Sequence, residues 1–293
     1  MAKAKTQVQE PGGASASAAS TAVATVDQQA LAIMQEQMAA DAGAGFEEAS
    51  ASAFAIPFLQ ILQSGSPQCK RSEGAFIPGA QEGMFLNTVT GEIFDGEGKL
   101  LPPDPETGEE REGGGVVVVP CHYTQRFIEW QKRETGGGFV AEHPPTTPLV
   151  LQTVKDDKGR DCLPNGNVLV DTRNHFCIML ADGRPVPVMI TFSSTQVKKS
   201  KNWMSKMQGI QMKVGTKFVP VPMMSRMYRL TTVPEKNDKG SWMGWKIVLE
   251  GEVTDPAIYG AAQDFRKAVI AGTAKASIPG EGELVPSNET VEA

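Results

Sequence analysis

The sequence predicts a mostly β domain with one or two appended helices, held between flexible N- and C-terminal tails. Short runs of β-branched and aromatic residues, separated by turn residues, recur through the middle of the chain. Two longer stretches there place apolar residues at helical spacing, and both ends hold almost no large apolar side chains. We therefore divide the 293 residues into a tail with one short helix at 1–53, a folded domain at 54–271 and an acidic tail at 272–293.

The N-terminal tail is expected to stay unfolded for most of its length. Residues 1–25 consist largely of Ala, Ser, Gly, Thr and Gln, which cannot offset the entropy of ordering the chain. In residues 27–40, the apolar residues Leu31, Ile33, Met34 and Met38 fit a short amphipathic helix with Asp27 as its N-cap.

Folding is expected to begin at residue 54, where the first strongly apolar run starts and is broken by Pro57. Residues 85–94 read as a hairpin, and the acidic, Pro- and Gly-rich residues 95–115 read as a long exposed loop. Further strands are expected at 116–119, 123–130, 149–154, 168–180, 186–192, 223–233 and 242–253. The domain is therefore predicted to be a meander of at least six strands.

Two helices interrupt or close this meander. The first is expected to begin near Ser194 and Thr195 and to cover residues 196–208. The second has Asp255 as N-cap, Pro256 at its first position and Gly272 after its end. Its apolar residues recur at helical spacing, which predicts that one face packs on the sheet.

The composition and the motifs argue against several classes of protein and of site. No apolar run is long enough for a membrane span and no signal-peptide pattern is present, so we expect a cytoplasmic protein without membrane contact. The cysteines are scattered and are expected to stay reduced, and the histidines show no metal-ligand spacing. No phosphate-binding loop or nucleophile elbow occurs. We therefore expect no metal, no cofactor and no catalytic residues.

Positive charge is concentrated in one part of an acidic chain. The formal net charge of -6 argues, taken alone, against nucleic-acid binding. Residues 183–234, however, contain no Asp or Glu. Such a window is either an ordinary solvated helix face with loop lysines or an anion-binding surface, and its length favours the second. Its cations are Arg184, Lys198, Lys199, Lys201, Lys206, Lys213, Lys217, Arg226 and Arg229.

Aromatic residues lie among these cations. Trp203 is surrounded by lysines and Tyr228 lies between two arginines. Alternation along residues 242–250 places Trp242 and Lys246 on the face opposite Trp245, so Trp242 is expected to point outward unless a helix or loop covers it. Proteins hold single-stranded nucleic acid with cations that track phosphates and aromatic rings on which unpaired bases stack. The window supplies both.

Several short motifs between residues 54 and 250 belong together. They are Ile56-Pro-Phe-Leu-Gln-Ile-Leu-Gln63 with Ser66-Pro67, Ile77-Pro-Gly-Ala80 with Gly83, Val116 to Pro120 with Tyr123 and Glu129-Trp130, and Ser193-Ser-Thr-Gln-Val-Lys-Lys-Ser-Lys-Asn-Trp203. As a set they resemble an early-gene protein family of tailed phages, some of whose members look like single-stranded DNA-binding proteins.

The resemblance implies an OB-like β-barrel with an appended helix and a DNA groove across one barrel face. It also implies an acidic C-terminal tail that contacts replication or recombination proteins or competes with DNA. The tail of this chain departs from that pattern, because it carries only scattered glutamates and ends Thr-Val-Glu-Ala without a terminal aromatic residue.

Our first hypothesis is a phage protein of the host cytoplasm that binds single-stranded DNA without sequence preference during replication or recombination. The alternative is a virion structural or assembly protein whose basic window faces packaged DNA or an acidic subunit. An enzyme with dispersed acidic residues is a third hypothesis. The DNA-binding residues expected under the first are Lys198, Lys199, Lys201, Lys206, Lys213, Arg226 and Arg229 for phosphates, and Trp203, Tyr228 and Trp242, with Lys246 beside it, for bases.

Overall fold

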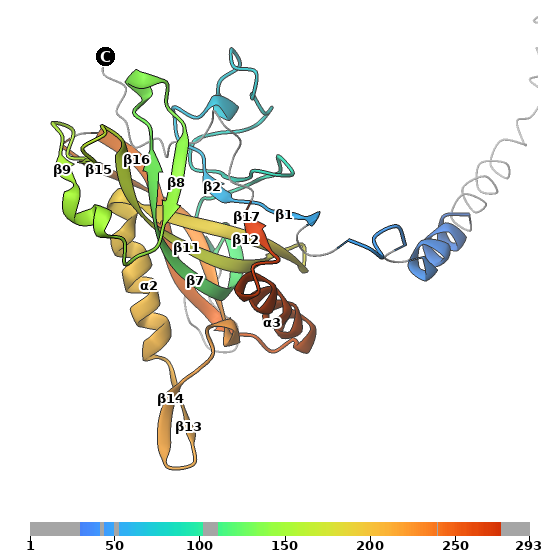
Figure 1. Ribbon diagram of the computed structural model, residues 1–293. Helices are drawn as coiled ribbons and strands as arrows, with labels where there is room; N and C mark the ends of the chain where they lie inside the picture. Colours follow the sequence, from blue (N-terminus) through green and yellow to red (C-terminus); the bar gives the residue numbers. More distant parts are fainter. Residues whose placement is uncertain (1–29, 42–43, 50–52, 102–110, 239, 277–293) are drawn as a thin grey trace, which may run out of the picture. The chain divides into compact units, whose positions relative to one another are not determined.

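A computed structural model describes residues 30–41, 44–49, 53–101, 111–238 and 240–276 (Figure 1). The chain divides into two compact units, Met1–Ala49 and Ser50–Ala293. Residues 1–29 of the expected N-terminal tail, residues 277–293 of the expected C-terminal tail and residues 102–110 of the expected loop lie outside the described residues.

The described part of the first unit contains one helix, over residues 30–40. This confirms the predicted helix over those residues, whereas its expected cap, Asp27, lies outside them. The side chains of Leu31, Ile33, Met34 and Met38 are each more than half exposed. The apolar face that predicted the helix is therefore open to solvent.

A single antiparallel sheet organises the second unit. Within the described residues it has eight strands in the order β16-β15-β7-β11-β10-β9, with β12 paired to β11 and β8 paired to β7. The long strands carry the sheet, and the short ones extend its edges. They are β7 (Val116–Trp130), β8 (Phe139–His143), β9 (Val154–Lys155), β10 (Asp161–Cys162), β11 (Val168–Ala181), β12 (Arg184–Ser193), β15 (Arg226–Asn237) and β16 (Gly240–Glu252).

The sheet is strongly curled, and smaller strand pairs lie around it (Figure 1). This confirms the predicted fold class, a mostly β domain with appended helices, and the curl is consistent with an OB-like barrel. The smaller pairs are β1 (Ala55–Ile56) with β17 (Lys275–Ala276), β2 (Leu59–Ile61) with β3 (Phe85–Asn87) and β4 (Ile93–Phe94), β5 (Lys99–Leu101) with β6 (Arg111–Gly113), and β13 (Gln211–Val214) with β14 (Lys217–Pro220).

Two of the expected elements are wrong in part. The strand expected at 149–154 is mostly a 3-10 helix, η4 (Pro148–Gln152), because Pro148 occupies its first turn and the Thr147 side chain accepts a hydrogen bond from the Leu149 amide. The long loop expected at 95–115 contains the β5 and β6 strands. The hairpin expected at 85–94 is confirmed as β3 and β4.

Both expected helices of the domain are confirmed. The first is α2 (Val197–Gly209), preceded by a 3-10 turn at Ser194–Gln196. The second is α3 (Pro256–Ile270), whose cap Asp255 accepts a hydrogen bond of 2.8 Å from the Ala257 amide. Gly272 follows its end with a φ of +70°, a conformation in which glycine is favoured.

The two helices pack on opposite faces of β11. On one face, His175 contacts Ser200 and Trp203 of α2. On the other, Phe176 packs against Phe265 of α3, with 6.4 Å between ring centroids. Successive side chains of a strand point to opposite faces, so α2 and α3 bury alternate residues of the same strand. Outside its contact with α3, the even-numbered face of β11 carries no helix of the described residues, although Thr172 and Asn174 on it are only 7% and 8% exposed.

Candidate functional site

The residues expected to bind DNA fall into four groups in the structure. Lys198, Lys201, Lys206 and Lys213 are exposed on α2 and on the β13–β14 hairpin, as is Lys217. None of these lysines has an ion pair within the part of the chain that the structure describes. They form a row of unneutralised positive charge on one helix and the hairpin that follows it.

Three other cations of the basic window are already matched by carboxylates. Lys199 pairs with Glu235, Arg226 with Glu252 at 2.9 Å, and Arg229 with Glu250 at 2.8 Å. The prediction that these cations are free to neutralise phosphates is therefore corrected. The pairing of β15 with β16 brings Glu250 and Glu252 beside Arg229 and Arg226, and the packing of α2 brings Lys199 to Glu235 of β15, so acids from beyond residue 234 meet a window that is free of acids in the sequence.

Trp203 and Tyr228 are wrong as stacking platforms, because both side chains are core. Trp203 is 1% exposed and Tyr228 is 2% exposed. The Trp203 ring stacks on His175 at a centroid distance of 4.6 Å and meets the edge of Tyr228 at 5.5 Å. Ser200, Trp203 and Met207 share the buried face of α2 because helical neighbours three and four residues apart lie on one side.

Trp242 differs from these two rings. It is half-buried, and its indole Nε1 donates a hydrogen bond of 2.9 Å to Glu235. Burial acts to raise the pKa of Glu235, but hydrogen bonds from Lys199, Gln196 and Trp242 outweigh it and lower the pKa. Lys246 is half-buried on the same strand. Trp242 lines a groove that the sequence reasoning did not identify.

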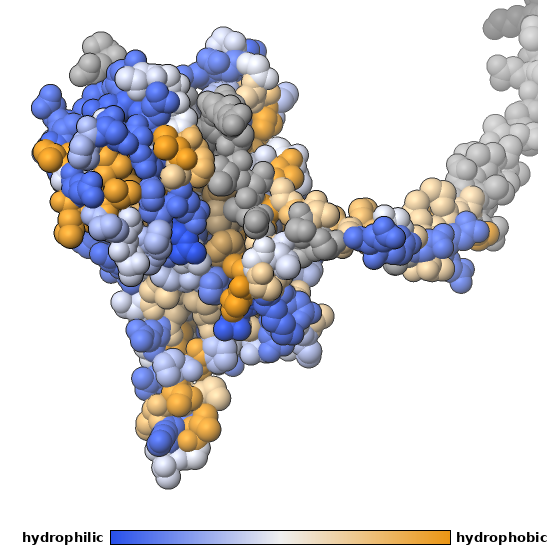
Figure 2. All heavy atoms as spheres, viewed as in Figure 1, coloured by the Kyte–Doolittle hydropathy of each residue, from blue (hydrophilic) through white to orange (hydrophobic). Residues whose placement is uncertain are grey.

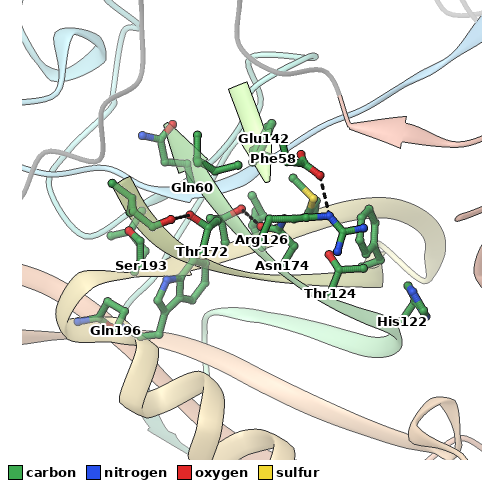
Figure 3. Close-up of a pocket in the computed structure, with 18 of the residues that line it drawn as sticks. Phe58, Gln60, His122, Thr124, Arg126, Glu142, Thr172, Asn174, Ser193 and Gln196 are labelled. Atoms are coloured by element: carbon green, nitrogen blue, oxygen red, sulfur yellow. Dashed lines mark hydrogen bonds and ion pairs between the residues drawn. The ribbon is translucent and has the colours of Figure 1, made fainter. Parts of the chain in front are cut away.

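This groove, of about 720 Å³, runs over the open face of the sheet. Its floor comes from alternate residues of β7, β11 and β12, and its sides come from β2, β8, β16 and the segment after α3. Figure 3 shows His122, Thr124, Arg126, Thr172 and Asn174 side by side across β7 and β11. The face of β11 that lines it is the one opposite α2, so the groove and the buried Trp203 lie on different faces of that strand.

The groove floor combines uncharged hydrogen-bonding side chains with apolar ones such as Val170 and Met189. Thr191 donates a hydrogen bond of 3.1 Å to the Oδ1 of Asn174, and Thr124 and Thr172 add hydroxyl groups beside them. The Oε1 of Gln60, at one side, is buried and finds no hydrogen-bond partner among the residues that the structure describes. Amide and hydroxyl groups can both donate and accept hydrogen bonds. The floor can therefore bind flat polar groups of either kind.

Aromatic rings stand along the sides of the groove. Trp130 and Phe139 meet edge to face at a centroid distance of 6.0 Å, and Phe139 is 38% exposed. Phe58 and Trp242 line other parts of the rim. Partly exposed rings in a polar groove offer flat faces for stacking.

Apart from His122, one cation and one acid line the groove within the described residues. Arg126 forms an ion pair of 2.7 Å with Glu142, the only acid that lines the groove in the described residues. Burial, and then the positive charges of Arg266 and Arg126, lower the pKa of His122. The side chain of Arg126 is 35% exposed and that of Glu142 is 44% exposed. Ion pairs between such exposed side chains contribute little to stability, so Arg126 can exchange Glu142 for another anion.

The sequence held a signal for this groove. His122, Thr124 and Arg126 alternate along one expected strand, and Thr172 and Asn174 alternate along the next. Polar side chains at every second position of two neighbouring strands indicate a polar sheet face. The prediction instead followed the concentration of lysines in residues 183–234.

The described residues contain no group of three or more His, Cys, Asp or Glu side chains that could hold a metal ion. Cys69, Cys121, Cys162 and Cys177 are free thiols, and burial raises the pKa of Cys121 to about 12. In the same part of the chain, no helix is both long and apolar enough to cross a membrane.

Comparison with known proteins gives one relationship. A protein-family model described as Pam3 phage gp34-like protein matches residues 25–275, which include the whole described sheet, the groove and both helices of the domain. No match was found among curated proteins or among solved structures.

Proposed function

The chain belongs to the Pam3 phage gp34-like protein family, and on this premise we propose that it binds single-stranded DNA, without catalysing a reaction, in the groove over β7, β11 and β12. The observation that carries the proposal is the combination, in one groove, of partly exposed aromatic rings at the sides, hydrogen-bonding side chains on the floor and Arg126, whose ion pair with Glu142 is exposed to solvent. The proposed role is to cover transient single strands during phage replication or recombination.

The rings account for the binding of bases. Phe139 and Trp130 present partly exposed faces, and a base that stacks on an aromatic ring gains about 1 to 3 kcal/mol. Bases of a duplex are already stacked and paired, so this gain is open only to unpaired strands. The ring faces therefore favour single strands over duplexes.

The floor accounts for binding without strict sequence preference. Asn174, Thr172 and Thr124 can each donate or accept, so each can meet more than one base edge. Arg126 of the groove provides charge for the phosphates, and Arg266 of α3, whose charge acts on His122, adds to it. Binding by such contacts weakens as salt rises, because released counterions favour association.

A catalytic role has less support from the geometry. The buried carboxylate of Glu129 accepts hydrogen bonds from Asn167 at 2.6 Å, Asn165 at 3.1 Å and His143 at 2.9 Å. The hydrogen bond from Asn167, followed by those from His143 and Asn165, lowers the pKa of Glu129 against the effect of burial. This carboxylate holds β7, β8 and the loop before β11 together, which is a structural task.

The test is a fluorescence-anisotropy titration of a labelled thirty-nucleotide poly-dT strand and of a matched duplex, at low and moderate salt. The account predicts tight, salt-sensitive binding of the single strand and much weaker binding of the duplex by the groove. Thr124→Glu, which adds a negative charge to the groove floor, should weaken the single-strand complex by at least tenfold.

The matched control is Thr146→Glu, which adds the same charge at an exposed loop residue outside the groove. Melting curves of both variants establish that they are folded. Equal affinities of the two folded variants for poly-dT would show that the strand does not lie in the groove.

A virion structural or assembly protein is the second candidate. The observation in its favour is the β13–β14 hairpin, on which Met212, Val214 and Phe218 are exposed. Large exposed apolar side chains commonly mark contacts with other macromolecules. Stoichiometric amounts of the protein in purified phage particles would favour this candidate over the first.

A further inference from the structure

The β13–β14 hairpin is a separate arm of the second unit. Its strands pair only with each other within the described residues, and the hairpin extends from the end of α2, away from the main sheet (Figure 1). The amide of Val221 donates to the Ile210 carbonyl at 3.0 Å and closes the base of the arm. An isolated two-stranded hairpin is at best marginally stable in water, so a partner that orders it would add to its stability.

The arm carries apolar side chains on both of its faces. Strand register places Met212, Val214 and Val219 on one face with Lys217, and Phe218 on the other with Lys213. Phe218 is 68% exposed, Val214 51% and Met212 46%. Figure 2 shows apolar and polar atoms next to each other on this arm. A flat partner would cover one face only, whereas apolar groups and a lysine on each face suit an occupant that surrounds the arm.

The charge of the arm selects the class of partner. Lys213 and Lys217 have no acid within the arm, and Lys206 and Lys201 of α2 continue the positive row. Self-association of two arms would bring lysines together, since no Asp or Glu occurs in residues 183–234. The complementary partner is a polyanion.

We infer that the β13–β14 arm enters a groove of duplex DNA. The major groove of B-DNA admits a two-stranded β-ribbon, and in other proteins apolar side chains such as Phe and Met are inserted between base steps. On the arm, Lys213 and Lys217 contact phosphates of the groove edges, while Phe218 and Met212 contact the bases.

This inference goes beyond the proposed function, because it gives a second surface a second ligand. The sheet groove takes the single strand and the arm takes an adjacent duplex. The DNA that would occupy both is a junction at which a duplex continues into a single-stranded tail.

The test uses the full chain and two variants of the arm. One is the double substitution Lys213→Gln with Lys217→Gln. The other replaces residues 211–220 by two glycines, which can join Ile210 to Val221 because these residues are already hydrogen-bonded. The control is Lys155→Gln with Lys236→Gln, which removes the same charge from exposed positions on β9 and β15.

Anisotropy is measured with a twenty-base-pair duplex, with poly-dT and with a junction made of both. The unmodified chain is expected to bind the junction at least tenfold more tightly than either part. Both arm variants should lose that advantage and at least tenfold in duplex affinity, with poly-dT affinity unchanged, and the charge variant should lower the salt slope for duplex by about two. The control should match the unmodified chain.

Three results would overturn the inference. The first is that both arm variants still bind the duplex and the junction as the unmodified chain does. The second is that the arm variants lose as much affinity for poly-dT as for the duplex. The third is that they lose self-association, measured by light scattering, while duplex binding stays intact. The last would assign the arm to contacts between protein chains. The proposed function fails separately, if the unmodified chain does not bind poly-dT whatever the arm does.

Discussion

The two faces of β11 have different surroundings although they belong to one strand. On the α2 face, His175 is fully buried against Trp203 and Phe192, and the aromatic rings pack on each other. On the groove face, Thr172 and Asn174 line a groove with partly exposed rings along its sides. The alternation of side chains along a strand separates its two faces, but a covering helix decides which face can bind a ligand.

The largest expected effect tests the α2 face of β11. Trp203→Ala should lower the free energy of unfolding by about 3 to 5 kcal/mol, because it leaves a cavity in the core. Lys201→Ala, at an exposed position of the same helix, should stay within about 0.5 kcal/mol of the unmodified protein. Urea unfolding measures both. An undiminished unfolding midpoint for Trp203→Ala would place that ring at the surface.

The next effect tests the open face. Phe139→Ala should reduce the affinity for poly-dT by about 1 to 3 kcal/mol, through loss of one stacking contact. Its effect on stability should be small, because the ring is 38% exposed. Leu151→Ala is the control, since this side chain is 90% exposed and does not line the groove. Indistinguishable affinities of the two variants would remove Phe139 from the interface.

The pH dependence of stability tests the burial of His175 on the α2 face of β11. Burial lowers the pKa of His175 to about 3, so the folded protein keeps this ring neutral at pH values where the unfolded chain binds a proton. Stability should therefore fall as the pH drops below about 6.5, by about 2 kcal/mol between pH 7 and pH 5. The lowered pKa of His122 acts in the same direction.

Urea midpoints at pH 7 and pH 5 measure this effect. His175→Phe removes the titrating ring, and its midpoint should change less over the same range, although the loss of the hydrogen bond to Ser200 lowers its stability at both pH values. An equal pH dependence in the variant would show that other groups carry the effect.

The smallest expected effect compares a cation of the groove with a cation of α2. Arg126→Gln should weaken poly-dT binding several-fold and lower the salt slope by about one, because it removes one phosphate contact. Lys198→Gln, at an exposed position of α2, should leave both quantities unchanged. Titrations at four salt concentrations give the slopes. A larger effect from Lys198→Gln would move the interface to the helix.

Much of the fold followed from local patterns. The strands at β7, β11, β12, β15 and β16, and the caps of α3, were visible because alternation and capping are properties of adjacent residues. The 3-10 helix at Pro148–Gln152 was missed because apolar residues in a short run fit a strand as well as a turn.

The site was harder to predict because it depends on which residues become neighbours. The pairing of Arg226 with Glu252 follows from the register of a hairpin whose strands are long, so a charge window read along the chain overlooked it. Trp203 lies three residues after Ser200 and four before Met207, a spacing that already indicated a buried helix face. The lysines around it obscured that signal.

The arm gave a weaker signal. Residues 211–220 contain a Gly-Thr pair between two short β-prone flanks, the same pattern as the hairpin at 85–94. Nothing in so short a segment tells whether it joins a sheet or stands apart from it, since that depends on partners elsewhere in the chain.

The central claim is that a single strand lies in the groove and not along α2. Photocrosslinking of a poly-dT strand that carries 5-iodouracil, followed by mass spectrometry, locates the strand directly. The account predicts crosslinks at Trp130, Phe139 or Trp242, which line the groove. Crosslinks confined to residues 197–209, with none on β7, β8 or β16, would contradict it.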